Sequence, residues 1–377
     1  MRLRLILLPM LVLGWLLACG GGGSSTPPPV PTGTLTLRLG ADSFPGYTQA
    51  VVSIEKVEAS TDGSSWTALG TVKNSYDLLA LQNGHSTGLI TAATLTAATY
   101  TQFRITWATV NYQSGAMQPA YVILSGGTGQ LAMPVTTIGA GSVVVPGNGS
   151  ATALLMLSGQ QAVQLRNGAY TFQATGRAYD LSAVAQITGH LGYGTTALPG
   201  VEVYAETVDG SGLATIQRRA FTDASGNYAL EGLPAGNLYF VVAQPAGATL
   251  SYAAVAATPV NATTPTTYLA DLAFSAPLAP GSLTLTITPA SLATQGTWGE
   301  LRQTLPTGSV GTQALIVRSQ SVASGLTQDL AGILGLAPGT YGITAQRSTS
   351  GATPTMKVGT QVLVSSGGTA TTLVTYP

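Results

Sequence analysis

Apolar and polar residues alternate along most of this 377-residue chain. Residues 34–39 place leucine at every second position between threonine and arginine, and residues 283–288 repeat the pattern with Leu, Ile and Thr. Successive side chains of a strand point to opposite faces, so this period gives each strand one apolar and one polar face. Gly, Pro, Asn and Asp separate the runs, as turns require. We predict an all-β chain of tandem antiparallel sandwiches of Greek-key, immunoglobulin-like type.

Helical periodicity is nearly absent from the rest of the sequence. Residues 87–98 are expected to form at most a short turn or helix, and no later segment is long and apolar enough to span a membrane. The mature length of about 360 residues exceeds what one core usually serves, which indicates about three domains.

The N-terminus has the layout of a secretion signal. Arg2 and Arg4 precede an apolar run, Leu5–Leu17, that is too short to cross a bilayer, which needs about 20 residues. The run ends in Leu16–Cys19, which resembles the lipobox of bacterial lipoproteins, although Leu17 is bulkier than the usual residue. The resemblance implies a signal peptide over residues 1–18, lipid attachment to Cys19, and an anchored mature protein.

The residues after the cysteine form a tether over residues 19–32. Glycines and serines make it flexible, and the prolines favour an extended conformation. Cys19 is the only cysteine, so we expect no disulfide. The alternative is a small apolar cysteine within an ordinary signal peptide cut elsewhere. Gly20 stands where aspartate would imply inner-membrane retention, so we predict the outer membrane, facing either the cell surface or the periplasm.

Charged residues make up only 7% of the chain. Removing Arg2 and Arg4 from the 14 basic residues leaves 12 against 14 acidic ones, a formal charge of −2 for the mature chain. Because nucleic-acid binding requires a basic stripe, we expect no nucleic-acid partner.

A turn followed by a tyrosine recurs along the chain. It occurs at Leu95–Tyr100, Leu233–Tyr239 and Leu336–Tyr341, and in a shorter form at Asn167–Tyr170. Such a tyrosine can bury its ring while its hydroxyl bonds to nearby backbone, as in the tyrosine corner of Greek-key sandwiches. We expect these tyrosines to be core residues.

Residues 33–183 resemble a bacterial lipoprotein domain family of unknown function. The resemblance rests on the order and spacing of several stretches, and residues 40–45 depart from the family's usual turn. It implies fold and location but no activity. The matching stretches are Val51–Glu58, Trp66–Leu69, Tyr76–Gly84, Tyr100–Ile105, Leu155–Ser158 and Tyr170–Ala174.

Residues 186–275 resemble a carboxypeptidase-regulatory-like domain, a transthyretin-like sandwich with some starch-binding-like relatives. The matching stretches are Ile187–His190, Leu198–Tyr204, Thr222–Leu230 and Gly232–Gly236. The resemblance implies a stabilising or adhesive spacer. Residues 282–377, after a Pro- and Gly-containing linker, are expected to form a third sandwich.

Candidate catalytic and metal-binding groups are sparse. The two histidines, His85 and His190, fall in different domains and are interpreted as solvated or packed residues. Glu202 and Glu206 share a strand face, but four strand residues span about 13 Å, too far for a glycosidase pair. We therefore expect that face to be solvated. We predict no catalytic residue, no metal and no cofactor.

Two further ligand classes remain open. Asp209, Asp223 and Asn227 could approach a calcium ion, but their turns lack the ligand pattern of an EF-hand. Exposed aromatic rings could stack on sugars, for which Trp298 is the first candidate and Tyr193 and Tyr204 are weaker ones.

We therefore carry three functional hypotheses. The first is a non-catalytic, lipid-anchored cell-envelope protein with a structural, adhesive or scaffolding role, in contact with polysaccharide or surface proteins. The second is a carbohydrate-binding accessory lipoprotein. The third is an enzyme of unrecognised type, for which a deep pocket with convergent polar groups would be required.

Overall fold

The computed structural model describes residues 29–376 except 43, 45, 46, 116, 117, 125, 159–162, 167, 168, 173–175, 290–296, 323–328 and 348–354. The predicted signal peptide, Cys19 and most of the tether lie outside these residues. The described part is all β apart from two short 3-10 helices, which confirms the predicted fold class. No helix within it is long and apolar enough to cross a membrane.

The first sandwich is one continuous sheet that encloses a single hydrophobic core. Its strand order is β10-β11-β7-β6-β2-β5-β8-β12-β9-β1-β4, and β3 pairs with β2. Its elements are β1 (Thr32–Ala41), β2 (Gln49–Ser60), β3 (Thr67–Asp77), η1 (Leu78–Leu81), β4 (Ser86–Thr96), β5 (Ala98–Trp107), β6 (Tyr121–Leu124), β7 (Gly127–Ala132), β8 (Thr136–Val145), β9 (Ser150–Leu157), β10 (Val163–Arg166), β11 (Ala169–Phe172) and β12 (Gly176–Asp180).

The expectation of a turn or helix at residues 87–98 is wrong, because β4 occupies this segment. Its many β-branched residues favour a strand, and β4 pairs with β1 through a ladder that contains irregularities near Leu37.

The second sandwich has two five-stranded sheets. One has the order β14-β13-β17 with β21 and β22 on β13, and the other has β16-β15-β18-β19 with β20 on β18. The strands are β13 (Val184–Tyr193), β14 (Thr196–Ala197), β15 (Glu202–Val208), β16 (Ala214–Phe221), β17 (Asn227–Pro234), β18 (Asn237–Ala243), β19 (Val255–Ala256), β20 (Val260–Ala262), β21 (Thr267–Leu269) and β22 (Leu272–Ala273).

The third sandwich packs a three-stranded sheet, β26-β23-β30, against a five-stranded one, β25-β24-β27-β28 with β29 on β27. Its elements are β23 (Gly281–Thr288), β24 (Thr297–Pro306), η2 (Gly308–Val310), β25 (Thr312–Val322), β26 (Asp329–Leu336), β27 (Gly339–Arg347), β28 (Thr355–Val358), β29 (Val362–Val364) and β30 (Thr369–Thr375).

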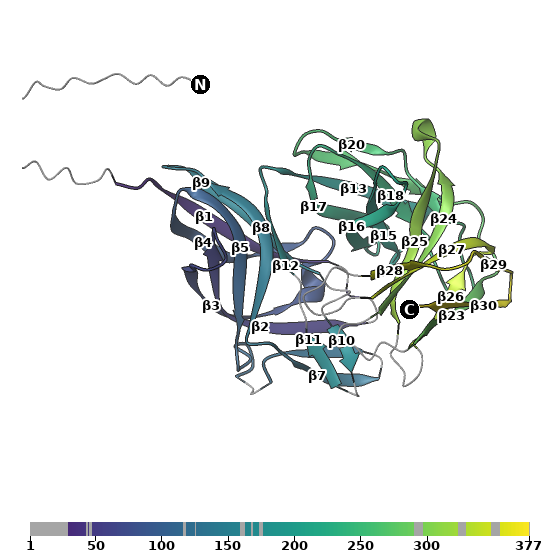
Figure 1. Ribbon diagram of the computed structural model, residues 1–377, viewed down its shortest axis with the longest axis horizontal. Coiled ribbons are helices and arrows are strands. Elements are labelled where there is room, and N and C mark those ends of the chain that lie inside the picture. Colours follow the sequence, from purple (N-terminus) through teal and green to yellow (C-terminus); the bar gives the residue numbers. More distant parts are fainter. Residues whose placement is uncertain are drawn as a thin grey trace, which may run out of the picture. The chain divides into compact units, whose positions relative to one another are not determined.

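The second and third sandwiches share hydrophobic core. In β18 the side chains alternate: Tyr239, Val241 and Ala243 lie in the second sandwich's own core, while Phe240 and Val242 belong to a core built mostly from the third. Strand β18 is therefore buried on both faces. Figure 1 shows β15, β16 and β18 beside β24 and β25, the strands between which this contact forms.

Three of the predicted tyrosine corners are confirmed. The hydroxyl of Tyr100 donates to Thr96 O at 3.1 Å, and that of Tyr341 donates to Ala337 O at 2.7 Å. In the second sandwich, Tyr239 donates to Pro234 O at 2.7 Å. All three rings are buried. The fourth tyrosine of the motif, at position 170, is partly buried against the first core.

The first and third sandwiches have the same central pairing. Strand β1 pairs antiparallel with β4 and parallel with β9, and β23 pairs in the same way with β26 and β30. Strand β2 lies between β3 and β5, as β24 lies between β25 and β27. The third sandwich is thus a smaller version of the central part of the first.

Candidate functional site

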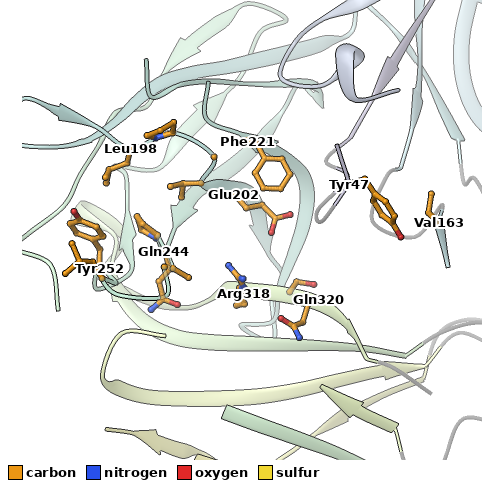
Figure 2. A pocket seen from close by; sticks show the side chains of 17 residues that line it. Tyr47, Val163, Leu198, Glu202, Phe221, Gln244, Tyr252, Arg318 and Gln320 are labelled. Carbon is orange, nitrogen blue, oxygen red and sulfur yellow. The ribbon is translucent and has the colours of Figure 1, made fainter. Parts of the chain in front are cut away.

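A cavity of about 620 Å³ lies where segments of all three sandwiches meet. Its volume is within the range of small-molecule sites. Figure 2 shows Tyr252 and Leu198 at one end, Tyr47 and Val163 at the other, and polar side chains between them. The lining residues are Tyr47, Val163, Leu198, Pro199, Gly200, Val201, Glu202, Phe221, Gln244, Pro245, Ala246, Gly247, Leu250, Tyr252, Arg318, Ser319 and Gln320.

The turn before β15 gives the cavity one of its walls. Gly200 has a positive φ of 68°, and the amide of Val201 donates to the hydroxyl of Thr222 at 2.9 Å. The same hydroxyl donates to Leu198 O at 2.6 Å. These bonds hold Leu198–Val201 in a fixed turn, as the Pro-Gly sequence predicts.

The carboxylate of Glu202 lies between a phenol and a guanidinium. It accepts a hydrogen bond from the Tyr204 hydroxyl at 2.7 Å, and its other oxygen lies 3.6 Å from Nη1 of Arg219. Burial, followed by the nearby Glu202 charge, raises the pKa of Tyr204 well above its ordinary value. The phenol therefore remains protonated and serves as a donor to Glu202.

Arg318, on β25, lines the cavity opposite this carboxylate. Figure 2 shows its guanidinium and the Glu202 side chain directed toward one another. Among the described residues Arg318 has no ion pair within 4.0 Å and no side-chain hydrogen bond. Within the described part of the chain, it is thus a cation at the cavity without an ion-pair partner.

Behind the cavity, side chains of β15 cover the free edge of β25. The amide of Ser319 donates to the Tyr204 hydroxyl at 3.2 Å, and the amide of Ile316 donates to Oε2 of Glu206 at 3.0 Å. Glu206 is fully buried, and burial raises its pKa to about 8. These contacts satisfy edge amides that a neighbouring strand would otherwise use.

A salt bridge between Arg302 and Glu300 lies near Glu206, which takes no part in it. Nη2 of Arg302 donates to Glu300 at 2.7 Å, while Nη1 donates to Ala214 O and Nε to Thr344 Oγ1, both at 3.0 Å. Because Arg302 has these partners, it makes no hydrogen bond to Glu206, whose Oε1 has none within the described residues.

The expectation that Glu202 and Glu206 lie on a solvated face is wrong. They do share a face with Tyr204, but the third sandwich covers that face. The opposite face, with Val203 and Ala205, lies in the second core as expected.

Two of the three candidate sugar-binding rings are buried. Trp298, on β24, is only 5% exposed, and Tyr204, whose hydroxyl accepts from the amide of Ser319 in the third sandwich, is only 1% exposed. Neither ring presents a face to solvent. Tyr193 is 38% exposed and lies 5.9 Å from the ring of Tyr252, so it is the predicted aromatic that remains accessible, at one end of the cavity.

The carboxylates considered for calcium bond to their own turns. Asp209 accepts from the amides of Ser211 and Leu213, and Asp223 from those of Ser225 and Asn227. No cluster of three His, Cys, Asp or Glu side chains arranged for a metal occurs among the described residues. Both histidines are exposed and lie in different sandwiches.

A second cavity, of about 350 Å³, is lined by three arginines and Tyr179. Arg218 stacks on that ring at 4.3 Å and donates to the carbonyls of Gln217, Glu231 and Gly232. Its guanidinium thus joins protein segments, which is a structural role.

Sequence reasoning did not find Arg318, Gln320 or Phe221. Phe221 is on β16, whereas Arg318 and Gln320 are on β25, so they meet only when β25 of the third sandwich lies against the second. No local motif in the sequence indicates that these three side chains line one cavity.

Among the comparisons with known proteins, one family model matches the chain, within the first sandwich. Residues 32–181, which make up the first sandwich, match a family model described as a domain of unknown function (DUF4382). No curated protein matches the chain.

Solved structures match at low identity. A leucine-rich repeat protein from Bacteroides thetaiotaomicron is 12% identical over 51% of this chain and 26% of its own, with a TM-score of 0.24. The Bacillus anthracis TIE protein is 11% identical over 92% and 50%, with a TM-score of 0.18. A streptococcal ancillary pilin is 10% identical over 90% and 98%, with a TM-score of 0.22. The chain therefore spans about a quarter and a half of the first two proteins.

Proposed function

We propose that the protein is a non-catalytic, lipid-anchored component of the bacterial cell envelope with a structural or adhesive role. The observation that carries the proposal is the shared core of the second and third sandwiches. Strand β18 contributes side chains to both cores, and the edge of β25 is covered by Tyr204 and Glu206. Two sandwiches joined in this way resist bending at the linker, which suits a spacer or a scaffold.

The proposed lipid anchor is supported by the sequence. The lipobox-like Leu16–Cys19 precedes a flexible Gly-, Ser- and Pro-rich tether. An anchored lipid, a tether and a rigid pair of sandwiches together suit a protein held away from a membrane.

Cell fractionation tests the anchor. We expect the wild-type protein in the membrane fraction and the Cys19→Ser variant in the soluble fraction or as an unprocessed precursor. Protease added to intact cells then separates the two roles. Digestion of the wild-type protein favours surface adhesion, and protection favours a periplasmic scaffold. Wild-type protein in the soluble fraction would contradict the anchor.

A second candidate function is carbohydrate binding. The observation that favours it is the cavity, whose lining includes the rings of Tyr47, Phe221 and Tyr252. The exposed ring of Tyr193 lies outside that lining, 5.9 Å from the ring of Tyr252. A glycan array with the soluble mature Cys19→Ser chain tests it. Absence of binding to every glycan would remove this candidate and leave the structural role in place.

A further inference from the structure

The charged side chains of the large cavity indicate the kind of group it accepts. Its lining contains one carboxylate, Glu202, and one guanidinium, Arg318. Glu202 is already held by Tyr204 and Arg219 on the floor of the cavity. Arg318 has no such partner among the described residues. A planar guanidinium binds a carboxylate through two parallel hydrogen bonds, so the unpaired group fits a carboxylate on a ligand.

The other side chains that line the cavity indicate the shape and polar groups of the rest of the ligand. Rings of Tyr252, Phe221 and Tyr47 offer flat apolar faces along the cavity, while Gln320 and Glu202 offer groups that can bond to hydroxyls (Figure 2). Burial raises the pKa of Tyr47 to about 12, so its phenol is a hydrogen-bond donor at neutral pH. A ring with apolar faces, hydroxyl groups at its edge and a carboxylate satisfies all of these groups.

An extended peptide fits less well. A peptide commonly binds by adding a strand to a free sheet edge and uses the edge amides. Here the edge of β25 beside the cavity is already engaged, because the amides of Ile316 and Ser319 donate to Glu206 and Tyr204. Strand addition at this place would break both bonds.

We propose that the cavity binds a short acidic oligosaccharide, with uronic-acid rings against the aromatic walls and one carboxylate paired with Arg318. This inference rests on the second candidate function and names its ligand class and its site. It does not depend on the lipid anchor.

Titration calorimetry with the mature chain, residues 19–377 carrying Cys19→Ser, tests the proposal. The probes are trisaccharides of galacturonate, glucuronate and mannuronate, each compared with its methyl ester, which removes only the charge. We expect at least one free acid to bind at least about ten-fold more tightly than its ester. Arg318→Gln should weaken that binding by about ten- to a hundred-fold, as loss of a charge-assisted pair does.

Two further variants make the result specific. Lys357→Gln removes a positive charge from an exposed site on β28 of the same sandwich and should leave the affinity unchanged. Tyr193→Leu removes the exposed ring at the end of the cavity. Thermal unfolding confirms that each variant is folded, and Arg318 has no described partner whose loss would unfold the protein.

The outcomes separate the two proposals. Equal binding of acid and ester, or unchanged binding by Arg318→Gln, would overturn the cavity site while leaving carbohydrate binding at Tyr193 in place. If Tyr193→Leu abolishes all glycan binding while Arg318→Gln leaves it unchanged, the cavity site is likewise overturned and the glycan binds at Tyr193. If none of the acids binds but neutral glycans do, the ligand class is wrong. If no glycan binds, both the site and the second candidate function fail.

Discussion

Replacing Glu206 by glutamine tests whether a buried carboxyl joins the second and third sandwiches in its neutral form. Glu206 is fully buried, and burial raises its pKa from 4.5 to about 8. The amide of Ile316 donates to one carboxyl oxygen, and the other has no hydrogen-bond partner within the described residues. Glutamine keeps the acceptor for Ile316 and the shape of the neutral acid, but it cannot ionise.

The direction of the pH effect follows from the proton balance. Below pH 4.5 the carboxyl is protonated in both the folded and the unfolded chain. Between pH 4.5 and about 8 the unfolded chain releases a proton that the folded chain retains, so the free energy of unfolding falls as pH rises. Above about 8 both states are ionised and the loss is complete. At about 1.36 kcal/mol for each pKa unit, the total approaches 5 kcal/mol as an upper value.

Urea unfolding of the mature chain at intervals from pH 5 to 9, followed by far-ultraviolet circular dichroism, measures this difference. We expect Glu206→Gln to match the wild type within about 1 kcal/mol at pH 5, as small changes of hydrogen bonding do. At pH 8.5 it should be more stable by several kcal/mol. A variant that is less stable than the wild type at every pH, by a constant amount, would refute the assignment of a neutral buried acid.

Three other substitutions give further expected outcomes, each measured by the same urea assay. Glu58→Gln should destabilise by about 0.2–1 kcal/mol at neutral pH. The hydrogen bond from a neighbouring arginine lowers the pKa of Glu58, so the difference should shrink as pH falls below 4.5 and not grow. Tyr341→Phe should lower the free energy of unfolding by about 2 kcal/mol, which is more than the loss expected for Tyr100→Phe. The reason is that the Tyr341 hydroxyl both donates to a backbone carbonyl and accepts from the buried amide of Gln244, whereas the Tyr100 hydroxyl only donates. Equal losses for the two variants would contradict this. Gly281→Ala should destabilise strongly, since its Cβ would lie within 3 Å of a backbone carbonyl, and a neutral effect would show that the turn adjusts.

Local sequence patterns predict the strands and corners of this protein well. A period of two specifies which residues share a strand face, as with Val203 and Ala205 in the second core. A tyrosine after a tight turn specifies its own hydrogen bond, because donor and acceptor are only four residues apart at Tyr100 and Tyr341. These features depend on short stretches of chain.

What covers a face is not a local property. The sequence places Glu202, Tyr204 and Glu206 on one face of β15, but polar residues suggest water on that face, whereas it meets the third sandwich. One signal for the contact does exist. Residues 238–243 are a continuous apolar run, and such a run indicates a strand buried on both faces. The cavity has no comparable signal, because its residues come from all three sandwiches.

The third sandwich, which carries no family resemblance in its sequence, can be understood from the first. Gly33 and Gly281 lie at or next to the first residue of equivalent strands, β1 and β23. An added Cβ would lie 2.2 Å from the carbonyl oxygen of Pro146 at Gly33 and 2.3 Å from that of Ser365 at Gly281. The residue after each glycine also makes an equivalent hydrogen bond. The amide of Thr34 donates to Gly149 O and the amide of Ser282 donates to Gly368 O, both at 2.9 Å.

The neighbouring ladders have matching register as well. Residues 98, 99 and 100 pair with 145, 144 and 143, and residues 339, 340 and 341 pair with 364, 363 and 362. The third pair in each set contains a corner tyrosine, Tyr100 or Tyr341; after it the β5–β8 ladder continues through a register shift. The first and third sandwiches thus agree in strand pairing, in register, in a crowded glycine and in a tyrosine corner. These four features lie in separate parts of each sandwich. The third sandwich therefore repeats the strand pairing of the first in a smaller form, in which β28 and β29 pair with β27 as the longer β8 pairs with β5.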